Sequence, residues 1–216
     1  MLICLEGANG VGKSTIIERL RIDFPDAIFT HLPGATKLGK ILRPIVRKTG
    51  EWVDLNDQTA FLLYAAEMHD FVASLAEMKD QLVFCDRWML STWVYQAPLV
   101  GPELTYQCLP KFCPDLLIYF TGDPVQCLKR AKGDSGWEKD DKALIRYNLY
   151  QQLITGTHPW WNKYIANQCI GTVGTINVDG SINNVYDQVI QIIDSYTKII
   201  DMQKIDAEEE ETHHES

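Results

Sequence analysis

A glycine-rich loop near the N-terminus holds the first residues whose types and spacing could do chemistry. Its sequence is LEGANGVGKST (5–15), in which four residues separate Gly7 from Gly12, and Lys13 and Ser14 follow at once. Such a loop curls so that its backbone amides face phosphate oxygens, while the lysine bridges the β- and γ-phosphates and the serine hydroxyl binds Mg²⁺. We therefore expect an ATP-binding loop made of Gly7, Asn9, Gly10, Val11, Gly12, Lys13, Ser14 and Thr15.

A second candidate group follows the apolar run of QLVFCDRW (81–88). Ligands of parallel α/β sheets bind beyond the carboxyl ends of the strands, and Asp86 stands directly after this run. We expect Asp86 and Ser14 to hold Mg²⁺, and we expect the planar fork of Arg87 to bind a second phosphate group. The alternative for Asp86 is a structural role as the cap of the next helix.

The order of elements predicts the sheet that would position these residues. Short apolar runs bounded by turn residues predict strands at 1–5, 27–31, 81–85, 115–120 and 173–178. Longer patterns predict helices at 13–22, 36–48, 55–79, 124–132, 139–165 and 182–203, and 98–114 is expected to be loop with one short helix. The alternation predicts an α/β fold in which helices cover both faces of a five-stranded parallel sheet.

Composition limits the class of protein. The net charge is −9, and the segment DAEEEETHHES (206–216) alone holds six carboxylates, so the remainder is only mildly acidic. This balance disfavours binding to a nucleic acid polymer, and no apolar run is long enough to span a membrane. We expect a cytoplasmic protein with six free thiols, one domain over 1–205 and a disordered acidic tail over 206–216.

Several motifs, in order, resemble the thymidylate kinase family of P-loop nucleoside monophosphate kinases. Besides LEGANGVGKST, they are PGATKLGKILR (33–43), DRWMLSTWVYQ (86–96), YFTGDPVQCLKRAKGD (119–134) and INVDGSINNVYDQVIQII (176–193). The resemblance implies a three-layer P-loop fold and a lid at about 129–139. It also implies phosphoryl transfer from ATP–Mg²⁺ to a deoxynucleoside monophosphate such as dTMP, by an enzyme that forms a homodimer.

The resemblance also implies roles for individual residues. Arg87 matches the arginine that holds the acceptor phosphate, and Tyr95 matches the tyrosine under the deoxyribose. Asn9 replaces the usual carboxylate near the 3′-hydroxyl. The acceptor-binding residues implied in this way are Asn9, Arg43, Tyr64, Met68, Arg87, Ser91, Thr92, Tyr95 and Gln96.

The lid is expected to supply positive charge to the transferring phosphoryl group. Family members without an arginine in the phosphate loop take this charge from the lid, and the segment Asn9–Val11 contains no arginine. Arg130 is the first choice for this role and Lys132 the second. With Lys13 and Arg87, these two complete the expected catalytic set.

Some positions depart from the family pattern. Met68 stands where the family has an arginine that reads the thymine carbonyl, with Glu67 and His69 as the nearby polar residues. Either thymine is read in another way, or the accepted base is different. A viral or otherwise divergent deoxynucleotide kinase, of a bacterial or infected host cell, is one hypothesis that fits this departure.

Two other functions stay open at this stage. A deoxynucleoside kinase needs a general base for a 5′-hydroxyl, usually a carboxylate after the second strand, but that strand ends in IFTHLPGA (28–35) without one. A phosphate acceptor is already ionised and needs no base, which favours a monophosphate, although Glu67 could be argued as a base. The other alternative is a P-loop ATPase without a small acceptor.

Overall fold

A computed structural model describes residues 1–52, 54–131, 142–166 and 170–214 of the chain. Its core is a five-stranded, all-parallel sheet in the order β2-β3-β1-β4-β5, which confirms the predicted fold class. The strands are β1 (Leu2–Glu6), β2 (Ile28–His31), β3 (Val83–Asp86), β4 (Leu116–Thr121) and β5 (Thr172–Asn177). Each lies within about two residues of its predicted range.

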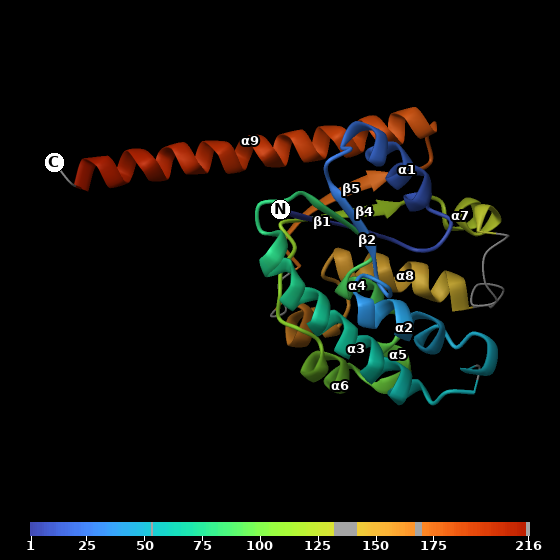
Figure 1. The fold of residues 1–216 in the computed structure, drawn as a ribbon. Helices are drawn as coiled ribbons and strands as arrows, with labels where there is room; N and C mark the ends of the chain where they lie inside the picture. The colour runs from blue at the N-terminus through green and yellow to red at the C-terminus, as the bar shows by residue number, and fades with distance from the viewer. Residues whose placement is uncertain (53, 132–141, 167–169, 215–216) are drawn as a thin grey trace.

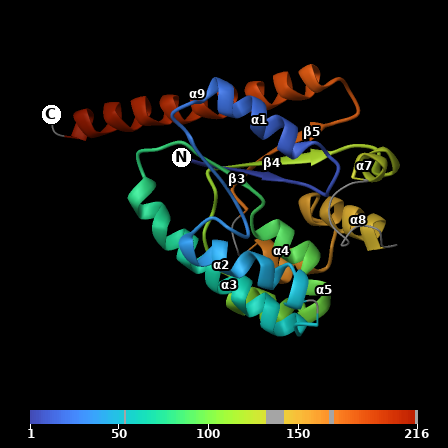
Figure 2. The same ribbon diagram turned by 45° about the vertical axis from the view of Figure 1, so that its right-hand side comes forward.

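Helices cover both faces of this sheet. Figures 1 and 2 show α1 (Lys13–Asp23) and α9 (Ile182–His214) on one face, and α3 (Asp57–Ser74), α4 (Met89–Tyr95) and α8 (Lys142–Ile154) on the other. The remaining α-helices are α2 (Lys37–Val46), α5 (Ala97–Val100), α6 (Pro102–Cys108) and α7 (Pro124–Arg130), and short 3₁₀ or π turns are η1 (Gly50–Trp52), η2 (Leu75–Met78) and η3 (Trp161–Ile165). Because β1 and β4 are covered on both sides, their residues are almost completely buried.

The helix predictions were wrong in three regions. The single helix expected over 139–165 is interrupted after Ile154, where Gly156 has a φ of 71° and Pro159 follows. A glycine in the left-handed region ends a helix, and proline cannot continue one. Helix α4 was not predicted, because its residues are almost all buried and show no amphipathic period, and 98–114 contains two short helices rather than one.

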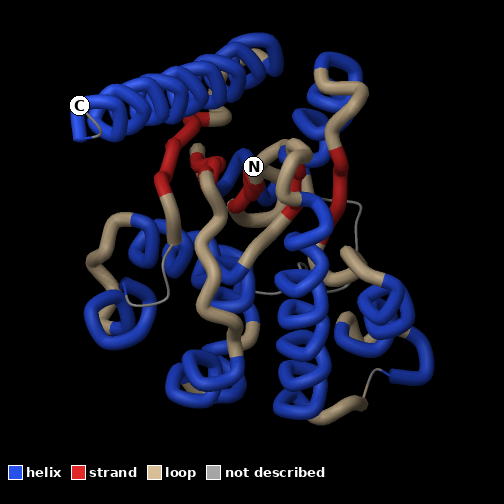
Figure 3. Tube along the Cα trace, turned by 60° about the vertical axis from the view of Figure 1, so that its left-hand side comes forward, coloured by secondary structure: helices blue, strands red, loops and turns tan. Residues whose placement is uncertain are grey.

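The acidic tail also differs from its prediction. Instead of a disordered segment from residue 206, α9 continues to His214, and Figures 1 and 3 show it as one rod that extends beyond the sheet. Glutamate and alanine are good helix formers, and extending an existing helix avoids the cost of nucleation. Residues 215 and 216 lie outside the described residues.

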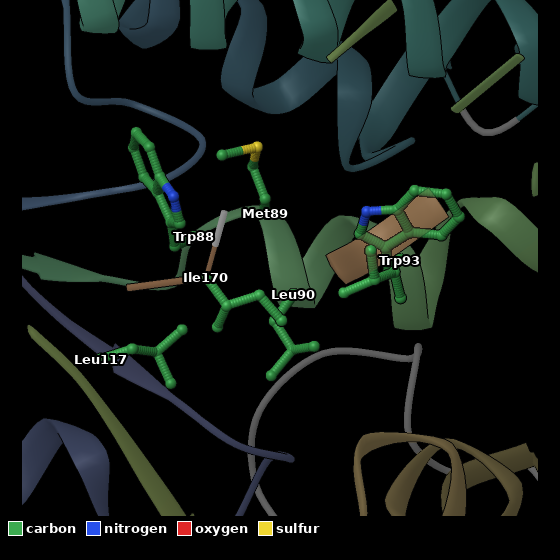
Figure 4. Close-up of a pocket in the computed structure, with 7 residues that line it drawn as sticks. Trp88, Met89, Leu90, Trp93, Leu117 and Ile170 are labelled. Carbon is green, nitrogen blue, oxygen red and sulfur yellow. The ribbon is translucent and has the colours of Figure 1, made fainter. Parts of the chain in front are cut away.

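A small cavity in the core lies between α4 and the sheet (Figure 4). It is lined by the hydrophobic residues Trp88, Met89, Leu90, Trp93, Leu117, Ile165 and Ile170. Because none of these side chains is charged, the cavity offers no cation that would hold a phosphate.

The described cysteines are mostly free. Cys4, Cys85, Cys108 and Cys127 are free thiols, as predicted, but Cys113 takes part in a disulfide.

The sheet register places the candidate site. In the pairing of β1 with β3, Leu5 lies opposite Asp86, so the phosphate loop and the Asp86–Arg87 segment leave the sheet side by side. Strand β4 on the other side of β1 leads through Asp123 into α7, whose first turn is capped by the Asp123 carboxylate. The carboxyl ends of the three central strands thus meet at one edge.

Candidate active site

The phosphate loop leads directly from β1 into α1. Gly12 precedes the helix with a φ of 92°, a left-handed conformation that favours glycine, and α1 begins at Lys13. The Lys13 ammonium group is buried and donates hydrogen bonds to the carbonyl oxygens of Gly7 (2.7 Å) and Ala8 (3.2 Å). Ser14 and Thr15 are exposed in the first turn. The loop thus gathers backbone amides, a lysine and a hydroxyl around one helix N-terminus, which suits an anion.

The loop also lies close to α7. Gly10 has a φ of 80°, and a Cβ atom at this position would lie 1.9 Å from the carbonyl oxygen of Cys127. Only glycine allows this approach. Val11 is 1% exposed and packs into the core, whereas Asn9 is half-buried. Of Asn9, Gly10 and Val11, Asn9 is therefore the residue whose side chain faces the rest of the site.

A buried carboxylate organises the segment after β3. Glu6, the last residue of β1, is 0% exposed, and its Oε1 accepts hydrogen bonds from the amides of Trp88 (2.7 Å) and Ser91 (2.9 Å). Its Oε2 accepts from the Ser91 hydroxyl (2.7 Å) and the Tyr150 hydroxyl (3.3 Å). Burial raises the pKa of Glu6, and the hydrogen bonds from Ser91 oppose this rise. Glu6 therefore connects β1, α4 and α8.

Arg87 lies at the centre of the site. Its φ is 76°, an unfavourable value for a residue with a side chain and one that occurs preferentially at functional sites. The guanidinium donates to Asn9 Oδ1, to Ser91 Oγ (3.2 Å) and to the Tyr150 hydroxyl (3.3 Å). The structure thus brings together Asn9, Arg87 and Ser91, three residues expected to bind the acceptor.

Tyr95 adjoins this cluster. Its ring lies 5.4 Å from the Arg87 guanidinium carbon and 5.1 Å from that of Arg146, both measured to the ring centroid. It also packs edge-on against the ring of Tyr150. Tyr95 and the next residue, Gln96, are half-buried at the end of α4.

Asp86 fits the expected role of a metal ligand. Its Oδ1 is buried and has no hydrogen-bond partner in the part of the chain that the structure describes. A buried carboxylate oxygen without a partner is costly unless a ligand satisfies it. Carboxylate and hydroxyl oxygens are the donors that Mg²⁺ prefers, so Asp86 and the exposed Ser14 suit this ion.

Glu67 holds the loop that follows β2. Its Oε1 accepts hydrogen bonds from the amides of Gly34 and Ala35 (3.0 Å for Ala35), while Oε2 is buried without a hydrogen-bond partner among the described residues. The carboxyl group packs directly against Gly39 of α2, where a Cβ atom would lie 2.1 Å from Oε1. Arg43 donates to the carbonyl oxygen of Pro33 in the same loop. Glu67 and Arg43 therefore fix this loop from two helices.

The residues expected around the base are mostly core residues. Tyr64 is 4% exposed and Met68 and Thr92 are 0% exposed, and the Thr92 hydroxyl contacts the Met68 sulfur at 3.7 Å. These side chains therefore pack against each other beneath the site, on α3 and α4.

The two lid cations are only partly described. Arg130 is exposed at the end of α7, and its guanidinium contacts its own helix at the Gln126 carbonyl oxygen (3.4 Å) and the Cys127 sulfur (3.5 Å). Lys132 and most of the expected lid, 132–139, lie outside the described residues. Whether either residue reaches a phosphoryl group stays a prediction.

Three residues of the cluster were missed from the sequence. Glu6 ends an otherwise apolar buried strand, and a carboxylate in that position is a signal that could have been used. Tyr150 and Arg146 lie one helical turn apart on α8, a spacing that places them on one face of that helix. Their contact with the site depends on how α8 packs, which the local sequence does not show.

Comparison with known proteins finds relatives of this chain. The thymidylate kinase family model matches residues 5–173. A thymidylate kinase of Legionella pneumophila (strain Paris) is 34% identical over 208 residues, covering 88% of this chain and 95% of the relative. Another, of Legionella pneumophila (strain Corby), is 34% identical over 159 residues, covering 68% and 75%.

Solved structures share the fold. Thymidylate kinase from Ehrlichia chaffeensis superposes with a TM-score of 0.62 at 19% identity and covers 89% of this chain and 98% of its own. Thymidylate kinase from Candida albicans superposes with a TM-score of 0.60 at 22% identity and covers 91% and 92%. The family model over residues 5–173 and the relative that is 34% identical over 208 residues show that the chain belongs to the thymidylate kinase family.

Proposed function

We propose that this chain transfers the γ-phosphoryl group of ATP to dTMP, giving ADP and dTDP. The chain is a nucleoside monophosphate kinase by family, and its site has the two halves that such a reaction needs. The phosphate loop with Lys13 forms the donor half, and Arg87 with its neighbours forms the acceptor half. The observation that carries the proposal is the direct contact between these halves, through the hydrogen bond from Arg87 to Asn9.

The residues act by positioning and by neutralising charge. Lys13 and the loop amides bind the phosphates of ATP, and Arg87 binds the acceptor phosphate, so the two phosphates meet at Asn9. Holding two reactants in this way replaces a bimolecular encounter by an effectively unimolecular step. The transferring phosphoryl group spreads negative charge over its oxygens, and cations at the site stabilise it.

Asp86 and Ser14 would hold Mg²⁺. Such an ion, when bound, would supply positive charge to the phosphate groups. The unpartnered Asp86 oxygen supports the assignment. Arg130 and Lys132 remain the cations proposed for the lid, which would close over the nucleotides and exclude water.

Glu67 weighs against phosphorylation of a nucleoside hydroxyl. A general base must reach the proton that it removes, but Glu67 is 0% exposed and its Oε1 is taken by two backbone amides of its own loop. An acceptor phosphate needs no base. The site as described therefore favours a monophosphate over a deoxynucleoside.

Met68 cannot read the base, because a thioether cannot donate a hydrogen bond to a carbonyl. We propose dTMP as the first acceptor to test, with the half-buried Tyr95 and Gln96 beside the nucleoside and the buried Tyr64 and Thr92 packed beneath it. We further propose a cytoplasmic homodimer. Among the described residues, no helix combines the length and apolar character needed to cross a membrane.

The proposal is tested by the acceptor dependence of ADP formation. Protein, ATP and Mg²⁺ are mixed with dTMP, dUMP, dGMP, dCMP or dAMP, with thymidine, or with no acceptor. ADP that forms with dTMP but not with thymidine supports the proposal. ADP with thymidine would indicate a nucleoside kinase, and ADP without any acceptor would indicate an ATPase.

A further inference from the structure

Arg146 offers a charge that the phosphate loop lacks. We propose that the Arg146 guanidinium of α8 stabilises the phosphoryl group during its transfer. This inference rests on the proposed kinase activity. The loop itself contains no arginine between Gly7 and Gly12, and Val11 is buried in the core. A cation for this purpose must therefore come from another element.

The position of Arg146 follows from the cavity that it lines. This small cavity lies where the phosphate loop, the end of α4, the lid helix α7 and α8 meet. Its lining residues are Ala8, Asn9, Tyr95, Cys127, Leu128, Ala143, Arg146 and Tyr147. Arg146 is the cation among them, and it is half-buried. It therefore faces the same loop residue, Asn9, that receives the hydrogen bond from Arg87.

Arg146 and Arg87 also share one aromatic ring. Both guanidinium carbons lie within cation–π distance of Tyr95, at 5.1 Å and 5.4 Å from the ring centroid. Arg87 is the residue proposed to bind the acceptor phosphate. Both guanidinium groups thus contact one ring, so Arg146 lies near the proposed acceptor-phosphate site and beside the loop proposed to bind the donor.

Helix α8 holds Arg146 in a fixed position. One residue further along α8, the Tyr147 hydroxyl bonds to both backbone groups of Gly122, accepting from its amide at 2.7 Å and donating to its carbonyl. One turn further along, the Tyr150 hydroxyl contacts Ser91 Oγ (2.7 Å) and Glu6 Oε2 (3.3 Å). These two tyrosines fix the part of α8 that follows Arg146, and a cation that needs little reorganisation stabilises a transition state best.

Arg130 differs from Arg146 in its exposure, in its position on the helix and in the contacts of its guanidinium group. It is exposed, stands at the last residue of α7 and places its guanidinium against its own helix. The described geometry therefore favours Arg146 over Arg130 as the source of this charge.

The test compares Arg146→Ala and Arg146→Lys with the wild type in steady-state assays with ATP, Mg²⁺ and dTMP. We expect the alanine change to lower kcat about 100-fold or more, as for the loss of one transition-state donor, with both KM values nearly unchanged. The lysine change keeps a positive charge without the planar fork, and we expect a loss of about 10-fold. Added guanidinium ion should restore part of the activity of the alanine variant.

The control is Asn148→Ala, because Asn148 is exposed on the same helix, and its rate should equal that of the wild type. Thermal unfolding shows whether each variant is folded. If Arg146→Ala is not folded, the kcat of Arg146→Lys tests the proposal instead. An unchanged kcat overturns the proposal. A raised KM for dTMP with unchanged kcat also overturns it, since Arg146 would then only position Tyr95. A wild type without dTMP-dependent ADP formation refutes the proposed kinase activity instead.

Discussion

Replacement of Glu67 separates a residue that holds a loop from a residue that removes a proton. Glu67→Gln retains an oxygen that can accept from the Gly34 and Ala35 amides, and it places an amide nitrogen where Oε2 has no described hydrogen-bond partner. Glu67→Ala removes the acceptor altogether. The two variants therefore differ in the hydrogen bonds that fix the loop, but both lack the carboxylate.

The hydrogen bonds set the expected magnitudes. Each bond to a charged group contributes about 1.5–3 kcal/mol, and the alanine variant loses two while it relieves the burial of a charge. We expect Glu67→Ala to lower the free energy of unfolding by about 2 kcal/mol. Arg43 of α2 contacts Pro33 in the same loop, so a loosened loop also displaces a residue expected to bind the acceptor. The KM for dTMP should therefore rise about 10-fold, the equivalent of 1.4 kcal/mol.

The glutamine variant carries a pH signature. Burial raises the pKa of Glu67 in the folded state, so the folded chain holds this proton to a higher pH than the unfolded chain does. The Glu67 carboxyl therefore contributes stability that the wild type loses as the pH rises from about 4.3 through the raised pKa, and Glu67→Gln lacks this pH-dependent contribution. Urea unfolding at several pH values should show that the free energy of unfolding of Glu67→Gln increases relative to that of the wild type as the pH rises.

Kinetics decide between the two roles. If Glu67 only holds the loop, Glu67→Gln keeps kcat within about 3-fold, whereas loss of a general base costs about 10² to 10⁴. A loss of that size in the glutamine variant, with stability unchanged, would refute the reasoning. Such a result would also support the alternative function, a deoxynucleoside kinase with Glu67 as its general base.

Three further substitutions test other parts of the site. Lys13→Ala should abolish measurable turnover while circular dichroism stays unchanged, and normal turnover would contradict the donor assignment. Arg87→Ala should raise the KM for dTMP by about 100-fold, since a charged hydrogen bond contributes about 1.5–3 kcal/mol, with the KM for ATP little changed. An effect on ATP alone would reverse the assignment. Gly10→Ala should weaken ATP binding, because its Cβ would overlap the Cys127 carbonyl, and unchanged binding of a fluorescent ATP analogue would count against the close packing of loop and α7.

Much of this fold follows from local sequence. All five strands were predicted because a parallel strand buried on both faces appears as a short apolar run between turn residues. The phosphate loop was predicted because its function requires particular residues at fixed spacing. Helix α4 was missed for the converse reason: a helix buried on nearly every side loses the amphipathic period that identifies it.

The site was predictable only where chemistry fixes the residue type. Lys13, Asp86 and Arg87 were expected at this site because groups that bind phosphate or Mg²⁺ follow such strands. The structure places them at one edge of the sheet, and their roles stay predictions. Glu6 and Glu67 were not given their roles, because a buried carboxylate that binds backbone amides has no sequence spacing of its own. The amides that these two carboxylates bind lie 32 to 85 residues away in the chain, and only the tertiary fold brings them together.

The fate of the γ-phosphoryl group tests the central claim most directly. ATP labelled with ³²P at the γ position is incubated with the protein, Mg²⁺ and dTMP, and the products are separated by thin-layer chromatography. The account predicts that the label moves into dTDP with almost none in free phosphate, and that Lys13→Ala forms no labelled product. Label recovered as free phosphate at the same rate with and without dTMP would contradict it.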